Sequence, residues 1–155
     1  MSAQIGSKAP DFTLKNQDMQ DVTLSAGFGK QHTVLAFFPA AFTSVCTKEL
    51  CTFRDQLAQL NRANAQVYGI SVDTPFTLKV FGQQNGLTFP LLSDFNKDVI
   101  RAYGVYLEDL VGLKGVARRA VFLVDAQGVI RHAEVTPTPG DEPDYARLNA
   151  AIAAL

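Results

Sequence analysis

The sequence predicts a single-domain α/β protein, spanning residues 1–155, whose central mixed β-sheet is flanked by helices and carries an N-terminal β-hairpin. The chain has 155 residues, of which 47% are hydrophobic and 19% charged, and this suits one compact domain with a sizeable core. Apolar runs of strand length alternate with helical patterns early in the chain, which indicates parallel strands. Two later apolar runs flank the turn sequence DAQG, which indicates an antiparallel hairpin at the sheet edge.

The elements of the first half follow from these apolar runs and from the residues that interrupt them. DFTL and VTL, on either side of a polar turn at residues 16–21, are typical of a small hairpin. The run from His32 to Phe38 is almost continuously apolar, as expected for a strand that is covered on both faces. A helix carrying both cysteines follows, and AQVYGISVD is a second buried strand. Thr74 and Pro75 then mark the start of another helix.

The second half continues the alternation. A short strand at residues 90–92 precedes a helix-like stretch that ends near residue 104, and an irregular, glycine-containing segment follows. RAVFLVD and VIRHAEV are the two strands of the late hairpin. The last segment places Tyr145, Leu148 and Ile152 at helical spacing. This order of elements predicts a mixed α/β sandwich of thioredoxin-like type.

Charge and composition exclude several classes of function. The net charge is −1, with 14 basic and 15 acidic residues evenly mixed, so we expect neither nucleic acid nor a membrane as a partner. The N-terminal segment MSAQIGSKAPDF lacks an apolar core of signal-peptide length, and we expect a cytoplasmic protein. A cysteine pair in that compartment is more often catalytic or metal-binding than structural. The two histidines, His32 and His132, lie far from the cysteines in sequence, so no metal cofactor is expected.

Both cysteines lie in the segment PAAFTSVCTKELC, directly after an apolar strand. If the helix starts near Ser44, Cys46 lies in its first turn, where free backbone N–H groups and the helix dipole favour a nucleophilic thiolate over a thiol. Cys46 also begins an apolar stripe, which should place it at the floor of a pocket facing the domain body. The later members of this stripe are Leu50, Phe53, Leu57 and Leu60.

Cys51 lies on a more polar face of the same helix, five residues after Cys46. In an intact helix, residues i and i+5 have Cα atoms about 8.7 Å apart and point about 140° away from each other. A disulfide needs a Cα separation of about 4.4 to 6.8 Å. The two cysteines can therefore join only if the first turns of the helix unwind, so we expect a helical reduced form and a locally unfolded oxidised form.

The segment FFPAAFTSVCTKELCTFRD resembles the peroxiredoxins, whose signature PxxxTxxC it contains, and within them the peroxiredoxin Q or bacterioferritin comigratory protein group. GSKAPDFTL, YGISVD, FPLLSD and RRAVFLVDAQGVI also resemble family segments. The resemblance implies a thioredoxin-like fold and a thiol peroxidase without a cofactor. Such an enzyme reduces hydrogen peroxide and organic hydroperoxides and is recycled by thioredoxin or a glutaredoxin-like dithiol protein. Members of this group are often monomers, so a monomer is expected.

The resemblance also assigns the site residues. Cys46 is the peroxidatic nucleophile and becomes a sulfenic acid, and Cys51 resolves that acid as an intramolecular disulfide. Thr43 directs its hydroxyl at the peroxide, and Pro39 forms a wall of the pocket. Arg119 stabilises the thiolate and the separating oxygens, and Glu49 orients Arg119 or a neighbour.

Arg118 precedes Arg119, and only one of two successive strand residues can face Cys46. The spacing to Phe122 favours Arg119. Family members commonly carry Thr or Ser between this arginine and phenylalanine, whereas this chain has Ala120 and Val121.

Simpler interpretations stay open beside these roles. A helical cysteine is often a small buried hydrophobe, Thr43 can be a helix cap, Pro39 can end a strand and Arg119 can form a surface ion pair. Glu49 can equally lie on a solvated helix face. Two alternative functions also stay open: a one-cysteine peroxiredoxin whose Cys46 is reduced directly by an outside thiol, and a redox-sensing or holdase protein.

Overall fold

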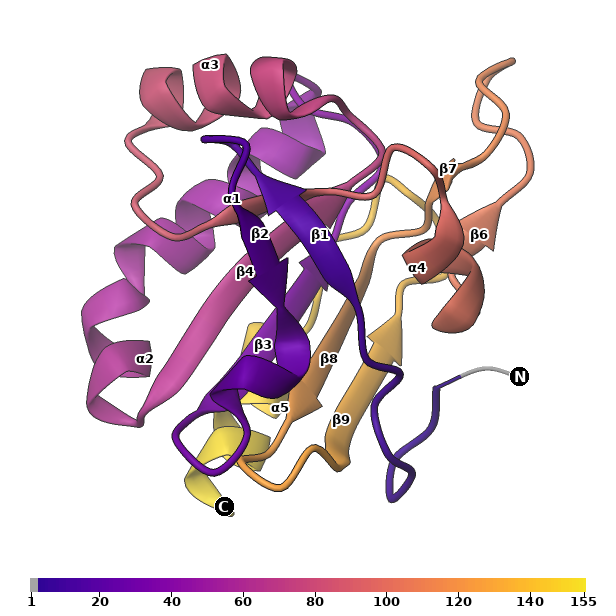
Figure 1. Cartoon of the computed structure of the whole chain (residues 1–155). Helices are drawn as coiled ribbons and strands as arrows, with labels where there is room; N and C mark the ends of the chain where they lie inside the picture. Colours follow the sequence, from indigo (N-terminus) through magenta and orange to yellow (C-terminus); the bar gives the residue numbers. More distant parts are fainter. Residues whose placement is uncertain (1–2) are drawn as a thin grey trace.

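The computed structural model describes residues 3–155, and a seven-stranded β-sheet lies at its centre (Figure 1). The domain predicted over residues 1–155 thus includes two residues outside the described part. The strands of the sheet are β1 (Thr13–Asn16), β2 (Asp21–Thr23), β3 (His32–Phe37), β4 (Ala65–Ser71), β5 (Leu91–Ser93), β8 (Ala120–Val124) and β9 (Ile130–Val135). Their spatial order is β2-β1-β5-β4-β3-β8-β9. Strands β3, β4 and β5 pair in parallel, and the other pairs are antiparallel, which confirms the predicted mixed sheet.

Helices cover both faces of this sheet. They are α1 (Ser44–Asp55), α2 (Leu57–Arg62), α3 (Pro75–Asn85), α4 (Asp98–Ala102) and α5 (Tyr145–Ala153), and a 3₁₀ turn, η1, spans Leu24–Gly27. The apolar residues of α1, α2, α3 and α5 join one core cluster, and those of α4 and the N-terminal segment join the other. Among residues 3–155, no helix combines the length and hydropathy that a membrane span requires.

Strand β3 divides the core because its side chains alternate between the two faces of the sheet. Val34 and Ala36 pack in the cluster under α1, whereas Leu35 and Phe37 pack in the opposite cluster with α4. All four are fully buried, so β3 is covered on both faces as its apolar run predicted. The end of β3 thereby fixes a rigid starting point for the segment that leads into α1.

Local signals position the neighbouring elements. The Thr74 side chain accepts a hydrogen bond from the Thr77 N–H at 3.3 Å, Pro75 is the first residue of α3, and Gly86 ends this helix with a φ of +62°. A hairpin joins β8 to β9, where Gly128 adopts a φ of +83°. The start predicted for α3 and the late hairpin are both confirmed.

Two details differ from the sequence prediction. The apolar stripe that begins at Cys46 continues across a distortion at Gln56, whose N–H is shared between two carbonyl groups, so that α1 and α2 are separate helices. The segment expected to be irregular contains a small antiparallel hairpin of β6 (Tyr106–Leu107) and β7 (Val116–Ala117). Between these two strands, the chain turns at residues 110–113 and projects towards the start of α1.

Candidate active site

Cys46 is the third residue of α1 and lies in the first turn of that helix. Thr43 comes directly before the helix and has an extended backbone conformation; it is the last residue of the segment that joins β3 to α1. The first backbone N–H groups of a helix have no partner within it, so those of Val45 and Cys46 carry partial positive charge that favours an anion beside them. The Cys46 side chain is only 1% exposed, so its sulfur lies at the floor predicted from the apolar stripe.

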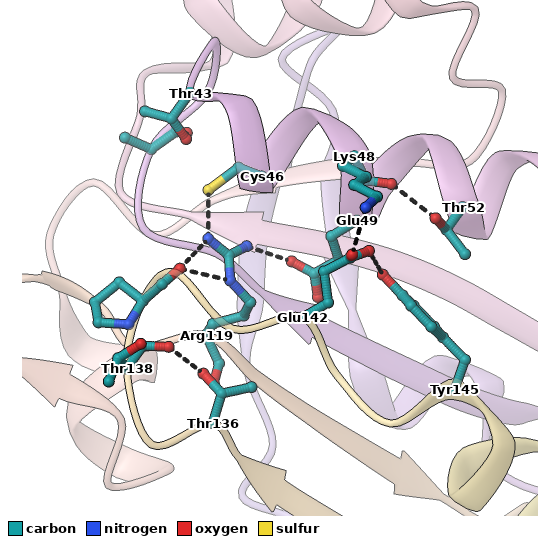
Figure 2. Close-up of polar contacts among 12 residues, drawn as sticks. Thr43, Cys46, Lys48, Glu49, Thr52, Arg119, Thr136, Thr138, Glu142 and Tyr145 are labelled. Carbon is teal, nitrogen blue, oxygen red and sulfur yellow. Dashed lines mark hydrogen bonds and ion pairs between the residues drawn. The ribbon is translucent and has the colours of Figure 1, made fainter.

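Arg119 brings a positive charge to this sulfur (Figure 2). Ala120, the next residue, pairs with Phe37 at the end of β3, and this register places Arg119 beside the start of α1. Its Nη2 atom lies 3.1 Å from Cys46 Sγ, and the Arg119 side chain is 2% exposed. Arg118 is exposed, which confirms that the second of the two arginines faces the cysteine.

Two further groups hold the guanidinium of Arg119. Its Nη1 atom donates to Oε1 of Glu49 at 2.8 Å. Its Nε and Nη2 atoms both donate to the carbonyl oxygen of Pro139, at 3.1 and 2.8 Å. The arginine is thus fixed from two sides while one N–H points at the sulfur, an arrangement that is preorganised for charge developing near Cys46.

The charges of this pair are set by burial. Burial raises the pKa of Glu49 to about 8, although Arg119 works to lower it. Burial lowers the pKa of Arg119, but Glu49 and Cys46 outweigh this effect and leave it above its ordinary value. Arg119 therefore stays positively charged beside the sulfur, whereas burial favours the protonated form of Glu49.

A second polar group lies next to Glu49 (Figure 2). Glu142 accepts a hydrogen bond from the hydroxyl of Tyr145 at 2.8 Å and forms an ion pair with Lys48 at 3.0 Å. Burial acts to raise the pKa of Glu142, but these two contacts lower it overall. The ion pair ties α1 to the loop before α5, and this loop also carries Pro139.

The pocket above Cys46 is a cavity of about 300 Å³ with mainly apolar walls. Pro39 and Thr43 line it, as predicted, and the Thr43 hydroxyl donates to the carbonyl oxygen of Ala40 at 2.8 Å. With its proton so directed, the Thr43 oxygen presents lone pairs that can accept a hydrogen bond from a hydroperoxide. The opposite rim is formed by the turn between β6 and β7, through Leu110, Val111 and Leu113.

Cys51 does not reach this pocket. It lies on α1, the same helix as Cys46, and both cysteines are free, so the reduced protein is helical here as predicted. Its Sγ atom contacts Oδ1 of Asn85 at 3.8 Å on the side of α3. Within residues 3–155, no cluster of three or more His, Cys, Asp or Glu side chains is arranged to hold a metal ion.

Sequence reasoning named four of the residues that line the pocket, which are Cys46, Arg119, Thr43 and Pro39. It also named Glu49, which does not line the pocket but accepts a hydrogen bond from Arg119. It missed the carbonyl of Pro139 and the rim at residues 110–113. A main-chain carbonyl leaves no side-chain signal in a sequence. The apolar LVGL at the rim was visible, but nothing in its spacing related it to the cysteine segment.

The site holds a buried cysteine in the first turn of a helix, with a fixed arginine beside its sulfur and an apolar pocket above it. This arrangement is suited to nucleophilic attack on an O–O bond, in which negative charge develops on the leaving oxygen. On a thioredoxin-like sheet, this combination defines a thiol-dependent peroxidase. The relatives of the chain agree. Residues 5–133 match the model of the AhpC/TSA family, and the chain belongs to that family.

Curated and solved relatives extend over nearly the whole chain. The chain is 43% identical to alkyl hydroperoxide reductase E of Mycobacterium tuberculosis over 153 residues, which is 97% of each protein. The crystal structure of peroxidoxin BcpB from Mycobacterium tuberculosis is 29% identical, with a TM-score of 0.84 and coverage of 97% of this chain and 95% of that one. Reduced 2-Cys peroxiredoxin of Plasmodium vivax is 27% identical, with a TM-score of 0.86 over 97% of this chain and 80% of the other. The predicted fold, family and enzyme class are therefore confirmed.

Proposed function

We propose that this enzyme reduces hydrogen peroxide and organic hydroperoxides in a two-cysteine cycle that begins at Cys46. The observation that carries the proposal is the contact of Arg119 Nη2 with Cys46 Sγ at 3.1 Å, in a guanidinium fixed by Glu49 and Pro139. The Cys46 thiolate attacks one peroxide oxygen, the O–O bond breaks, and the other oxygen leaves with the electron pair and takes up a proton. Cys46 becomes a sulfenic acid, and water or an alcohol is released.

The pocket supports organic substrates as well as hydrogen peroxide. Its walls are mainly apolar, and Val111 and Leu113 expose apolar surface at its rim. An alkyl group beside these residues loses contact with water, which favours binding by about 25 cal/mol for each Å² buried. The alkyl hydroperoxide reductase to which this chain is 43% identical bears a name that fits such a substrate.

The second step is the attack of the Cys51 thiolate on the Cys46 sulfur. An S–S bond forms, hydroxide leaves the sulfenic acid and is protonated to water, and the oxidised protein holds a disulfide. The helical α1 keeps these residues too far apart for that bond, so the step includes unwinding of its first turns. A dithiol protein of the thioredoxin or glutaredoxin-like type would then exchange with the disulfide. We propose that the cycle runs in the cytoplasm in a monomeric enzyme.

A one-cysteine cycle is the second candidate, because α1 is intact and Cys51 is half-buried on the far side of it from the pocket. In that cycle an outside thiol attacks the Cys46 sulfenic acid directly. A redox sensor or holdase differs from both in that peroxide consumption is slow while oxidation exposes apolar surface.

The intact mass after one equivalent of hydrogen peroxide separates these candidates. Loss of two hydrogens, with Cys46 and Cys51 joined in the peptide map, supports the two-cysteine cycle. Gain of one or two oxygens on Cys46 with Cys51 free contradicts it and leaves the one-cysteine cycle. The matched variant Cys51→Ser should still gain oxygen at Cys46, and it should lose turnover with thioredoxin as the reductant.

A further inference from the structure

Asn85 is the last residue of α3, and its side chain contacts Cys51 on α1. Its side-chain amide makes two contacts: Nδ2 donates to the Phe81 carbonyl at 2.9 Å, and Oδ1 accepts from Cys51 Sγ at 3.8 Å. The first contact fixes the amide within α3, and the second therefore holds the Cys51 thiol on the side of α1 that faces α3. Asn85 does not line the peroxide pocket.

Arg54, which lies on α1 one helical turn after Cys51, contacts the backbone of the same residue. Its Nη1 atom donates to the backbone carbonyl oxygen of Asn85 at 2.7 Å. Its stem passes 3.9 Å from the position that a Cβ would take at Gly86, the residue that ends α3. The end of α3 is thus held against the turn of α1 that carries Cys51, and the amide oxygen of Asn85 has a fixed position relative to the thiol.

An amide oxygen can accept a hydrogen bond from a thiol but has none to offer to a thiolate. The attack on a sulfenic acid needs the thiolate. The contact with Asn85 is therefore present in the protonated, helical state of Cys51, and it is lost both when the thiol ionises and when α1 unwinds.

We propose that Asn85 is a positioning residue that restrains the resolving cysteine: it holds the Cys51 side chain against α3 and slows its attack on the Cys46 sulfenic acid. This inference rests on the proposed two-cysteine cycle. The restraint lengthens the life of the sulfenic acid, and it sets the share of Cys46 that a second peroxide can oxidise further to sulfinic acid.

Two substitutions at Asn85 test this role because they act in opposite directions. Asn85→Ala removes the acceptor and should speed disulfide formation about threefold, a factor in keeping with the loss of one weak neutral hydrogen bond. Asn85→Asp strengthens the acceptor and adds a negative charge that disfavours a neighbouring thiolate, so it should slow the step by about threefold or more. A residue that only stabilised the fold would change the rate in the same direction in both variants.

The measurement is a rapid-quench experiment. Each reduced protein is mixed with one equivalent of hydrogen peroxide, free thiols are alkylated at set times, and intact masses give the sulfenic acid and the disulfide. Exposed Gln84 offers a matched control on the same turn of α3, and Gln84→Ala should match the wild type. The rate of sulfenic acid formation should stay unchanged in every variant.

The outcomes separate the inference from the cycle on which it rests. Faster disulfide formation in Asn85→Ala together with slower formation in Asn85→Asp supports the restraint. Equal rates, or a change in the same direction in both variants, overturns it while the two-cysteine cycle stands. If the wild type forms no disulfide at all, the two-cysteine cycle is wrong and the role of Asn85 is rejected with it.

Discussion

Replacement of Arg119 by lysine tests the central feature of the active site. The guanidinium contacts the Cys46 sulfur, the Glu49 carboxyl group and the Pro139 carbonyl at once, through three different nitrogen atoms. A lysine keeps the positive charge but has a single ammonium group on a flexible stem, which cannot reproduce this fork of donors. Arg119→Lys thus removes directed hydrogen bonding while it leaves the net charge of the protein unchanged.

The magnitude follows from the contact with the sulfur. A hydrogen bond to a charged group contributes about 1.5 to 3 kcal/mol. If the bond at 3.1 Å is needed as charge moves from sulfur to the departing oxygen, its loss should slow Cys46 oxidation by about 10- to 150-fold. The neighbouring Arg118 is exposed and provides the matched control, because Arg118→Lys should leave the rate unchanged.

The assay measures one turnover. A Cys51→Ser background excludes any resolving step, and the rate of sulfenic acid formation with hydrogen peroxide is followed by rapid quench and intact mass. An Arg119→Lys rate within about threefold of the wild type would refute the argument that directed donation by the guanidinium accelerates the attack. The thermal unfolding transition of the variant shows whether it is folded, and so distinguishes a slower reaction from a loss of structure.

Three further predictions concern stability. Burial raises the pKa of Glu49 from 4.5 to about 8, so the native state binds more protons than the unfolded chain between these values, and the free energy of unfolding due to this group falls as pH rises through that window. Glu49→Gln should remove this slope in urea titrations from about pH 5 to about pH 9, and an unchanged slope would contradict the burial argument. A Cβ at Gly69 in β4 would lie 2.9 Å from two leucine carbons, so Gly69→Ala should cost about 1 to 3 kcal/mol, and an unchanged Tm would show that the core can adjust. Thr74→Ala should cost ~1 kcal/mol through loss of the α3 cap, measured by urea unfolding, and no loss would mean that Pro75 alone suffices to start the helix.

The sequence predicted the functional residues whose chemistry belongs to a single side chain and whose position follows from the pattern of the neighbouring residues. Cys46 follows a buried strand and starts an apolar stripe, and these two signals together set both its helix turn and its burial. Only one of Arg118 and Arg119 can face Cys46 because residues in a strand alternate between faces, and the spacing to Phe122 distinguished Arg119. Glu49 was less certain from sequence, since a glutamate on a helix is usually solvated, and its complete burial depends on the tertiary pairing with Arg119.

Features that depend on the backbone path could not be predicted in this way. The approach of the turn at residues 110–113 to the pocket depends on the path of a long irregular segment, which no periodicity describes. The break at Gln56 is also invisible in the pattern, because the apolar stripe continues across it. The contact between Cys51 and Asn85 joins residues 34 positions apart, so it needs the packing of α1 on α3 to be known.

The hydrogen bonds from Arg119 to a main-chain carbonyl have a consequence for the substitutions that the active site can tolerate. The family match ends at residue 133, whereas Pro139 lies beyond it, in the segment between β9 and α5. Any amino acid supplies a carbonyl oxygen, so the contact depends on the course of the loop and not on the identity of the side chain at this position. A substitution at Pro139 that keeps the course of the loop would therefore leave the contact with the arginine in place, whereas a deletion that shortens the loop would release it.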